Sequence, residues 1–253
     1  MLDKQEVLAY IRQNEFANTK QLCEHFQVSE STVRRLLDKL DAAGLVTRIH
    51  GGAMPVSDPN KMTEFQLRNR QNKAQKIAIA REAAKLINEH DTVILMGGTT
   101  VCEMCPFIEH RRITVITNSI LVLNGLRYSQ NVRLVMLGGL YNYQEEEIGG
   151  LMRNQELGRM RANRIFMGSS GFDEHFGFAI TNASIDMYNS CIESSLSVCV
   201  LADSSKYMSG GAVISARPDQ VEYLITDNGL DTRTRSAMEE SGVNVIAVVP
   251  DAV

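Results

Sequence analysis

Five short clusters of glycine, hydroxyl, amide and charged residues could together hold an anionic small molecule. They are Gly97-Gly98-Thr99-Thr100, Thr117-Asn118-Ser119, Gly138-Gly139, Gly168-Ser169-Ser170-Gly171 and Asp203-Ser204-Ser205-Lys206. Backbone N–H groups at a glycine turn, neighbouring hydroxyl groups and a helix N-terminus attract anions. The first cluster offers such groups, and Lys206 offers a cation. The sequence therefore predicts an anion-binding pocket, provided that the fold brings the clusters together.

A second set of residues could contact nucleic acid. Arg34 and Arg35 can reach a phosphate or a guanine edge, and the hydroxyl groups of Ser31 and Thr32 can hold phosphates. We expect the DNA contacts to come from Ser29, Ser31, Thr32, Arg34, Arg35, Arg48, His50 and Gly51. The alternative is a small three-helix interaction module whose polar third-helix face is only solvated.

The cysteines suggest a third kind of chemistry. Cys102 and Cys105 resemble a redox or metal pair, and they follow the GGTT turn at an expected helix N-terminus, where a thiolate is favoured. Four-coordinate zinc would need distant partners such as His110 or Cys191. Two ordinary half-buried thiols are the alternative. Five cysteines, an odd and scattered number, do not make a disulfide framework.

Two other groups of charged residues are less informative. The run Glu145-Glu146-Glu147 is interpreted as a solvated loop, as charge runs in connections usually are. Asp173 and His175 lie near the GSSGFD turn and are better placed to reach the pocket.

The first 57 residues predict the elements that would present the DNA contacts. Residues 3–13, 19–26 and the segment up to Ala43 favour three short helices, and LVTRIHGGA (45–53) favours a hairpin. The third helix has one apolar stripe, Val33, Leu36, Leu37 and Leu40, with Ser29 as N-cap and Gly44 as C-cap. This layout is typical of a winged helix-turn-helix, whose third helix enters the major groove and whose hairpin reaches a neighbouring phosphate or minor groove.

Seven apolar segments predict the sheet that would gather the polar clusters. They are 92–96, 113–117, 132–137, 164–168, 197–203, 221–226 and 243–249. Most are apolar at nearly every position, and helix-like segments separate them. Such a pattern indicates an α/β domain with a mainly parallel sheet and helical crossovers covering both faces. Ligands bind at the carboxyl edge of such sheets, which is where the clusters would meet.

Charge and length indicate how the chain divides. Its 253 residues exceed one average domain of about 150 residues. Residues 1–57 carry seven basic and seven acidic residues, 58–76 carry five and two, and 77–253 carry fourteen and twenty-one. We therefore expect the winged helix-turn-helix domain at 1–57, a linker at 58–76 and the α/β domain at 77–253, and the resemblance described below implies that this last domain senses an effector.

The composition also bears on location. No apolar run approaches the roughly 18 residues that cross a bilayer, and MLDKQEVLAY carries charges where a signal peptide is apolar. We expect a cytoplasmic protein with no membrane partner. The net charge of −4 argues against a protein whose whole surface binds nucleic acid, but it is compatible with a local DNA-binding surface.

The segment SESTVRRLLDKLDAAGLVTRIHGGA resembles the signature of the DeoR family of bacterial transcription regulators. EFQLRNRQNKAQKIAIAREAAKLI, GGTT, ITNS, LGG, GSSGFD and ADSSKY then follow in the order of that family, so the resemblance covers nearly the whole chain. It implies a winged-helix domain joined to a Rossmann-like sensor domain similar to ribose-5-phosphate isomerase.

The resemblance also implies a function. It points to a sequence-specific regulator, more commonly a repressor, of a carbohydrate-metabolism operon, acting as a homo-oligomer (dimer or tetramer) on double-stranded DNA. A phosphorylated sugar or related metabolite would bind the sensor domain, and no other cofactor or metal is expected. We expect effector contacts from Gly97, Gly98, Thr99, Thr100, Asn118, Ser119, Gly139, Ser170, Asp173 and Lys206.

Three positions depart from the family pattern. Leu36, Met96 and Asn189 stand where the family usually has an aspartate, an aspartate and a lysine. Periodicity places Leu36 in the core stripe. Losing a cation at Asn189 would weaken phosphate binding by about 1.5–3 kcal/mol.

Two alternative functions remain open from the residues. A sugar-phosphate isomerase could use Asp173 as base and Lys206 as cation, but the missing groups at Met96 and Asn189 and the DNA-binding module argue against it. A thiol- or metal-responsive regulator would use Cys102 and Cys105.

Overall fold

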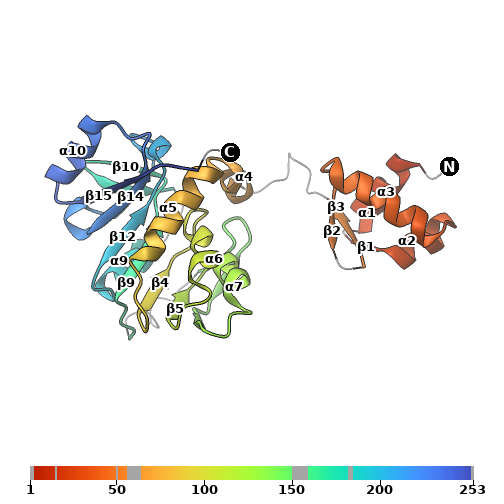
Figure 1. The fold of residues 1–253 in the computed structure, drawn as a ribbon, viewed down its shortest axis with the longest axis horizontal. Helices are drawn as coiled ribbons and strands as arrows, with labels where there is room; N and C mark the ends of the chain where they lie inside the picture. Colours follow the sequence, from red (N-terminus) through yellow and green to blue (C-terminus); the bar gives the residue numbers. More distant parts are fainter. Residues whose placement is uncertain are drawn as a thin grey trace. The chain divides into compact units, whose positions relative to one another are not determined.

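The chain forms two compact units, Met1–Met62 and Thr63–Val253. The computed structural model describes residues 3–14, 16–49, 51–55, 64–149, 159–181 and 185–251. Figure 1 labels the α-helices of both units and those strands for which there is room. Each unit encloses its own apolar core.

The first unit is a winged helix-turn-helix, as predicted. Its elements are α1 (Lys4–Asn14), β1 (Ala17–Asn18), α2 (Thr19–Phe26), α3 (Glu30–Ala42), β2 (Val46–Ile49) and β3 (Gly52–Pro55). The β2–β3 hairpin is antiparallel, and β1 pairs with the other side of β3. The wing is therefore a three-stranded sheet attached to the helices through β1.

Helix α3 begins after Ser29, as predicted, and ends at Ala42, so that Ala43 and not Gly44 is its C-cap. The Ser29 hydroxyl accepts a hydrogen bond from the backbone N–H of Thr32 at 3.4 Å, and Gly44 has φ +67° just beyond the helix. The apolar stripe is confirmed, because the side chains of Val33, Leu37 and Leu40 are buried and that of Leu36 packs partly buried against them.

The second unit has a larger set of elements. The helical elements are α4 (Glu64–Arg70), α5 (Lys73–Lys85), η2 (Val101–Met104), α6 (Cys105–Ile108), α7 (Ile120–Leu126), α9 (Ile185–Glu193), η3 (Ser204–Lys206), η4 (Pro218–Gln220) and α10 (Thr232–Glu240). The strands are β4 (Thr92–Leu95), β5 (Thr114–Thr117), β6 (Arg133–Met136), β7 (Leu140–Asn142), β8 (Glu147–Gly149), β9 (Arg164–Gly168), β10 (Gly171–Asp173), β11 (Gly177–Ile180), β12 (Val198–Leu201), β13 (Val213–Ala216), β14 (Tyr223–Asp227) and β15 (Asn244–Val248).

The central sheet has seven strands in the order β15-β14-β12-β9-β4-β5-β6, and all its pairings are parallel. Six of the seven predicted apolar segments contain one whole strand of this sheet, and the segment 221–226 contains β14 except for its last residue, Asp227. Successive residues alternate between two cores: Ile94 and Met96 belong to one, and Val93 and Leu95 to the other. Both faces are thus buried, which explains why the segments are apolar throughout.

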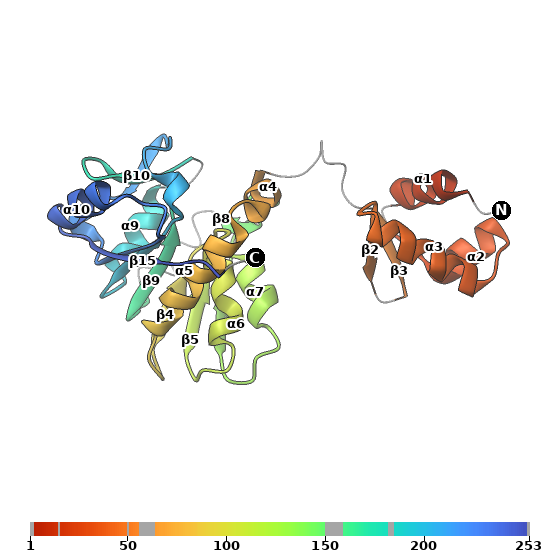
Figure 2. The ribbon, with the colours of Figure 1, turned by 45° about the horizontal axis from the view of Figure 1, so that its top comes forward.

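The two faces are covered differently. Helices α5, α6 and α7 pack with η2 on one face, and Figures 1 and 2 show α5 crossing that face. The opposite core contains residues of α9 and α10 and of the antiparallel sheet β10-β11-β13. The expectation of helical crossovers on both faces is therefore only partly right, because much of the second cover is a small sheet.

The predicted linker at 58–76 contains regular structure where it is described. Residues 64–70 form α4, and α5 begins at Lys73, so both belong to the second unit. Asn72, between the two helices, has a left-handed backbone with φ +51°. Residues 58–63 lie outside the described part of the chain. Among the described residues, none of the helices combines the length and apolar character needed to cross a bilayer.

The hairpin β7–β8 approaches the backbone of Gly139, one of the predicted effector contacts. Gly139 has φ +148°, and a Cβ there would overlap the carbonyl oxygen of Gly149. This glycine permits the close approach of the two strands rather than lining the pocket described below. Its neighbour Gly138 has open space where a Cβ would lie, and its φ is not positive.

We expect Gly139→Ala to lower the free energy of unfolding by about 1–3 kcal/mol, because the new Cβ is both strained and obstructed. Gly138→Ala should stay within about 0.5 kcal/mol of the unmodified chain. Urea unfolding followed by circular dichroism measures both. Equal stability of the two variants would contradict the tight approach of β7 and β8.

Candidate functional site

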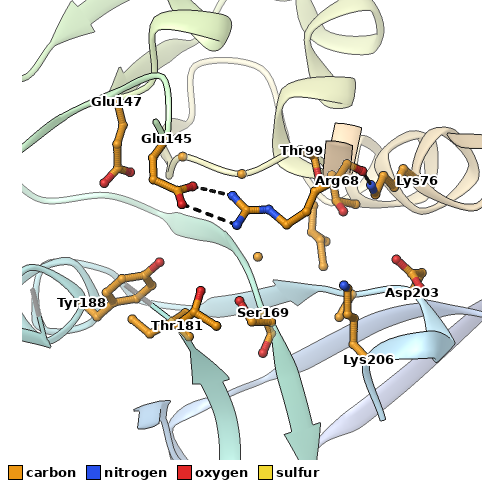
Figure 3. A pocket seen from close by; sticks show the side chains of 18 residues that line it. Arg68, Lys76, Thr99, Glu145, Glu147, Ser169, Thr181, Tyr188, Asp203 and Lys206 are labelled. Atoms are coloured by element: carbon orange, nitrogen blue, oxygen red, sulfur yellow. Dashed lines mark hydrogen bonds and ion pairs between the residues drawn. The ribbon is translucent and has the colours of Figure 1, made fainter. Parts of the chain in front are cut away.

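A pocket opens at the carboxyl edge of the central strands β4, β9 and β12 (Figure 3). It is lined by Arg68, Lys76, Gly97, Gly98, Thr99, Thr100, Glu145, Glu147, Gly168, Ser169, Ser170, Ile180, Thr181, Tyr188, Leu201, Ala202, Asp203 and Lys206. The turns after the three strands supply much of this lining. Helices α4 and α5, the β7–β8 turn and α9 supply further side chains.

The turn after β4 offers hydrogen-bond donors to the pocket. Among the described residues, the backbone N–H groups of Gly98, Thr99 and Thr100 donate no hydrogen bond. The two threonine side chains, each less than a tenth exposed, add hydroxyl groups. The turn is held in place because the Asn118 side-chain oxygen accepts from the N–H of Gly97 at 3.2 Å. This arrangement suits an anionic ligand group.

The expected contribution of a helix N-terminus to this turn is small. The turn leads into the four-residue 3-10 helix η2 and then into the four-residue helix α6. So short a stack of peptide dipoles carries little macrodipole. Anion binding here would therefore depend on individual N–H and hydroxyl groups and on nearby cations.

Two lysines bring positive charge to the pocket. Lys206 is half-buried, and its ammonium group makes no hydrogen bond or ion pair with any residue that the structure describes. Lys76 is buried, and its ammonium donates to the carbonyl oxygen of Arg68. Burial lowers the pKa of Lys76 from its ordinary value, while the nearby Asp203 carboxylate opposes that shift.

An ion pair between Arg68 and Glu145 lies at the pocket, as Figure 3 shows. The guanidinium donates through both terminal nitrogens to the two carboxylate oxygens. Glu147 lines the same pocket and accepts from the Asn118 amide at 3.2 Å. The interpretation of residues 145–147 as a solvated loop was therefore wrong for Glu145 and Glu147.

Asp203 ties the start of α5 to the turn after β12. Its carboxylate is buried and accepts from the Asn72 amide at 2.9 Å, and also from the N–H and hydroxyl groups of Ser205. The Asn72 amide contacts the Ser205 hydroxyl at 3.1 Å as well. Arg68, Asn72 and Lys76, spaced four residues apart, thus all reach the pocket or its rim.

The structure brings six of the ten predicted effector residues to the pocket. These are Gly97, Gly98, Thr99, Thr100, Ser170 and Lys206. Sequence reasoning missed Arg68, Lys76, Glu145, Glu147 and Tyr188 as lining residues, whereas the predicted cluster that contains Lys206 also supplies Asp203. The excess of basic residues at 58–76 is the sequence signal for Arg68 and Lys76, although charge alone predicts a linker there.

The other four predicted effector residues do not line the pocket. Gly139 is at the hairpin, as described above. Asn118 is buried behind the pocket wall and holds Gly97 and the β7–β8 hairpin. Ser119 is the buried N-cap of α7. Asp173 accepts from the backbone N–H groups of His175 and Phe176, so it stabilises a turn instead, and His175 is exposed there.

The two unusual sensor positions lie outside the pocket. Met96 is 1% exposed within the core, with its sulfur 3.4 Å from that of Cys191. Asn189 is exposed on α9, although its neighbour Tyr188 lines the pocket.

The predicted DNA contacts on α3 divide into free and paired side chains. Arg35 is exposed and makes no ion pair with any described residue. Arg34 is exposed and pairs with Glu30 at 2.5 Å. The hydroxyl groups of Ser31 and Thr32 lie 3.0 and 2.9 Å from that of Ser29, so the three form a small network at the start of the helix.

The wing residues are more constrained. The Arg48 guanidinium lies 3.3 Å from the Asp38 carboxylate and donates to the carbonyl of Gly52, so it joins the wing to α3. Gly51 has φ +82° at the exposed turn, and its carbonyl accepts from the Thr19 N–H at 2.8 Å. His50 lies outside the described residues.

A winged helix carrying exposed basic residues, followed by an α/β domain with a polar pocket, defines a ligand-responsive transcription regulator. Comparison with known proteins agrees. The DeoR-like helix-turn-helix domain matches residues 4–58, and the DeoR C terminal sensor domain matches residues 71–228. The chain belongs to the DeoR family of transcription regulators.

Relatives match over nearly the full length. The HTH-type transcriptional regulator YulB of Bacillus subtilis is 31% identical over 97% of this chain and 95% of its own length. The transcriptional repressor AccR of Agrobacterium fabrum is 31% identical over 90% and 89%, and the lactose phosphotransferase system repressor of Staphylococcus epidermidis is 31% identical over 96% and 97%. These relatives are named as regulators rather than as enzymes.

Solved structures align with part of the chain. Ribose 5-phosphate isomerase A from Methanocaldococcus jannaschii covers 54% of this chain and 55% of its own, at 18% identity and a TM-score of 0.40. The eIF2B beta protein from Chaetomium thermophilum covers 60% and 48%, at 16% identity and a TM-score of 0.45.

The two cysteines next to the pocket do not have the thiolate character that a redox or metal pair would need. The pKa of Cys102 and that of Cys105 are each raised to about 12, mainly by burial, and the Glu103 carboxylate is the second cause of the rise for Cys102. The Cys102 thiol donates to the carbonyl of Thr99 at 3.2 Å. The described residues contain no group of three or more His, Cys, Asp or Glu side chains placed to hold a metal ion.

We expect iodoacetamide to label Cys102 and Cys105 slowly at pH 8, because a pKa of about 12 leaves only about one thiolate in ten thousand. The labelling rate should rise as the pH increases. Peptide mass spectrometry gives each rate, with the urea-unfolded chain as control. Fast labelling of the folded chain at pH 7 would revive the thiol-sensor alternative.

Proposed function

We propose that this chain represses a carbohydrate-metabolism operon, and that a phosphorylated sugar or related metabolite in the pocket controls its binding to the operator. The observation that carries this proposal is the set of N–H donors at Gly98, Thr99 and Thr100 in the same pocket as the Lys206 ammonium, none of them bonded to a described residue. A phosphate group needs several donors and a cation of this kind. Among the relatives, the lactose phosphotransferase system repressor acts on a sugar system.

The DNA would be read by α3 and by the wing. Arg35 is free to contact a phosphate or a guanine edge in the major groove, and Ser31 lies on the same exposed face. Arg34 would have to leave Glu30 or reach DNA beside it. Arg48 positions the wing through Asp38, so we assign it a supporting role alongside Gly51.

We further propose that the chain acts as a homo-oligomer in the cytoplasm, on an operator with palindromic or directly repeated half-sites. Residues 1–57 carry equal numbers of basic and acidic residues. One such module neutralises few phosphates and gains little electrostatic affinity. Two linked modules on one DNA gain affinity through their high effective concentration.

The pocket and the DNA-binding unit would communicate through α4. This helix is the first described element of the second unit, and its Arg68 lines the pocket. Asn72 and Lys76 extend the same contacts into α5. A ligand that changes the partners of these side chains would favour one arrangement of α4 over another, which is the requirement for coupling.

We expect Arg35→Ala to weaken operator binding about tenfold or more, because a lost guanine or phosphate contact costs about 1–3 kcal/mol. The DNA is a sequence selected by the chain from a random library, and a gel-shift titration measures the affinity. Lys20→Ala, on the exposed surface of α2, is the matched control and should bind nearly normally.

The same titration gives the stoichiometry, which we expect to be at least two chains per operator. A one-to-one complex of nanomolar affinity would contradict the oligomer proposal. Unchanged affinity of the Arg35→Ala chain would remove α3 as the reading helix.

We expect Lys206→Ala to weaken binding of a phosphorylated sugar about ten- to a hundredfold, as the loss of a charge-assisted hydrogen bond implies. Thermal shift against a panel of sugar phosphates and sugar acids measures this, since a ligand at 100 times its Kd adds about 2.7 kcal/mol of stability.

Lys85→Ala, which removes an exposed lysine of α5 paired with Glu82, is the charge-matched control. Arg35→Ala should keep the full thermal shift, and Lys206→Ala should keep DNA binding. If no member of the panel stabilises the chain, or if Lys206→Ala responds normally, the pocket is not the anion site.

A further inference from the structure

The Arg68–Glu145 pair places an internal carboxylate in the pocket. Arg68 extends from α4 and Glu145 from the turn between β7 and β8, and both side chains line the pocket (Figure 3). The side chains are 30% and 18% exposed, so the pair is partly shielded from water. Each of the two terminal guanidinium nitrogens donates to one carboxylate oxygen.

An arginine can bind an anionic ligand with the same two-donor geometry that Arg68 uses to bind Glu145. The planar fork of arginine binds carboxylate and phosphate groups with the same two parallel N–H donors. A partly buried guanidinium needs an anionic or polar partner, because desolvation without one is costly. Glu145 therefore occupies the site on Arg68 that an anionic group of a bound ligand would use.

The other charged groups of the pocket indicate that an anionic ligand would replace a carboxylate of the chain rather than bind beside the existing ion pairs. Arg68, Lys76 and Lys206 line it together with Glu145, Glu147 and Asp203, so acidic and basic residues balance. Asp203 is already held by Asn72 and Ser205, and Glu147 by Asn118. Glu145 differs because its carboxylate is paired with the end of one long arginine side chain. An entering anion can compete with it directly.

We propose that Glu145 is an internal competitor for the effector, and that an anionic group of the effector replaces it as the partner of Arg68. The inference rests on the function proposed above and specifies its regulation. Arg68 is then an effector-binding residue. The strength of its pair with Glu145 sets the effector concentration at which the effector replaces Glu145. The chemistry is an exchange of hydrogen bonds, with no covalent step.

The test uses inorganic phosphate as probe, titrated calorimetrically into the full chain at constant ionic strength and pH. Glu145→Gln keeps the size of the side chain but removes its charge, so phosphate should bind about tenfold more tightly. Arg68→Ala should bind phosphate about tenfold more weakly. Glu82→Gln, which breaks the ion pair with Lys85 elsewhere on the unit, is the matched control and should bind as the unmodified chain does.

The opposite signs of the two changes separate exchange from a merely structural ion pair. If the pair only stabilised the fold, both variants would lose thermal stability and neither would bind phosphate more tightly, which would overturn the proposal. Should Glu145→Gln fail to fold, Glu145→Asp serves instead. It keeps the charge but shortens the reach to Arg68, and absence of any tightening would again overturn the proposal.

Lys206→Ala distinguishes this inference from the proposed function. If phosphate binds, depends on Lys206 and is not tightened by Glu145→Gln, only the competitor role of Glu145 fails. If phosphate does not bind to the unmodified chain or to Glu145→Gln, both the anion pocket and the exchange fail.

Discussion

The pocket depends on one constraint, which is that parallel strands place all their carboxyl ends at the same edge of a sheet. Strands β4, β9 and β12 are neighbours, and they end at positions far apart in the sequence, Leu95, Gly168 and Leu201. The register of these strands is fixed because alternate side chains enter two different cores, and a shift of one residue would exchange the cores. Burial of apolar side chains thus determines where the polar groups of the pocket lie.

The same constraint explains how much of the fold could be predicted. Strands buried on both faces must be apolar at nearly every position, so all seven were recognisable as continuous segments. The stripe of α3 and its Ser29 cap were equally local signals. The sheet β10-β11-β13 could not be predicted, because its strands are short and because β11 pairs with β13 across α9, β12 and η3. No periodicity in the local sequence predicts such a pairing.

The pocket residues also divide into those that local sequence could predict and those that it could not. Those that follow the buried strands, such as Thr99 and Lys206, could be predicted because the strand that precedes each of them was visible. Asn118 and Ser119 also follow a strand, but β5 lies one position further along the sheet, and their side chains support the wall rather than face the pocket. Arg68 and Glu145 reach the pocket from a helix and a hairpin turn. Their meeting across 77 positions depends on tertiary packing, which single-sequence patterns do not encode.

The internal partners of the pocket cations have a consequence for how the regulator can respond. Arg68 is paired with Glu145, and the Lys76 ammonium donates to the backbone carbonyl of Arg68, so both cations have partners within the chain. A ligand group that binds Arg68 must then replace the ion pair with Glu145, so its net gain there is smaller than the strength of the new hydrogen bonds. Binding of this kind is weaker but more easily reversed than binding to unpaired buried cations. A metabolite sensor needs that property, because it has to release its ligand when the metabolite concentration falls.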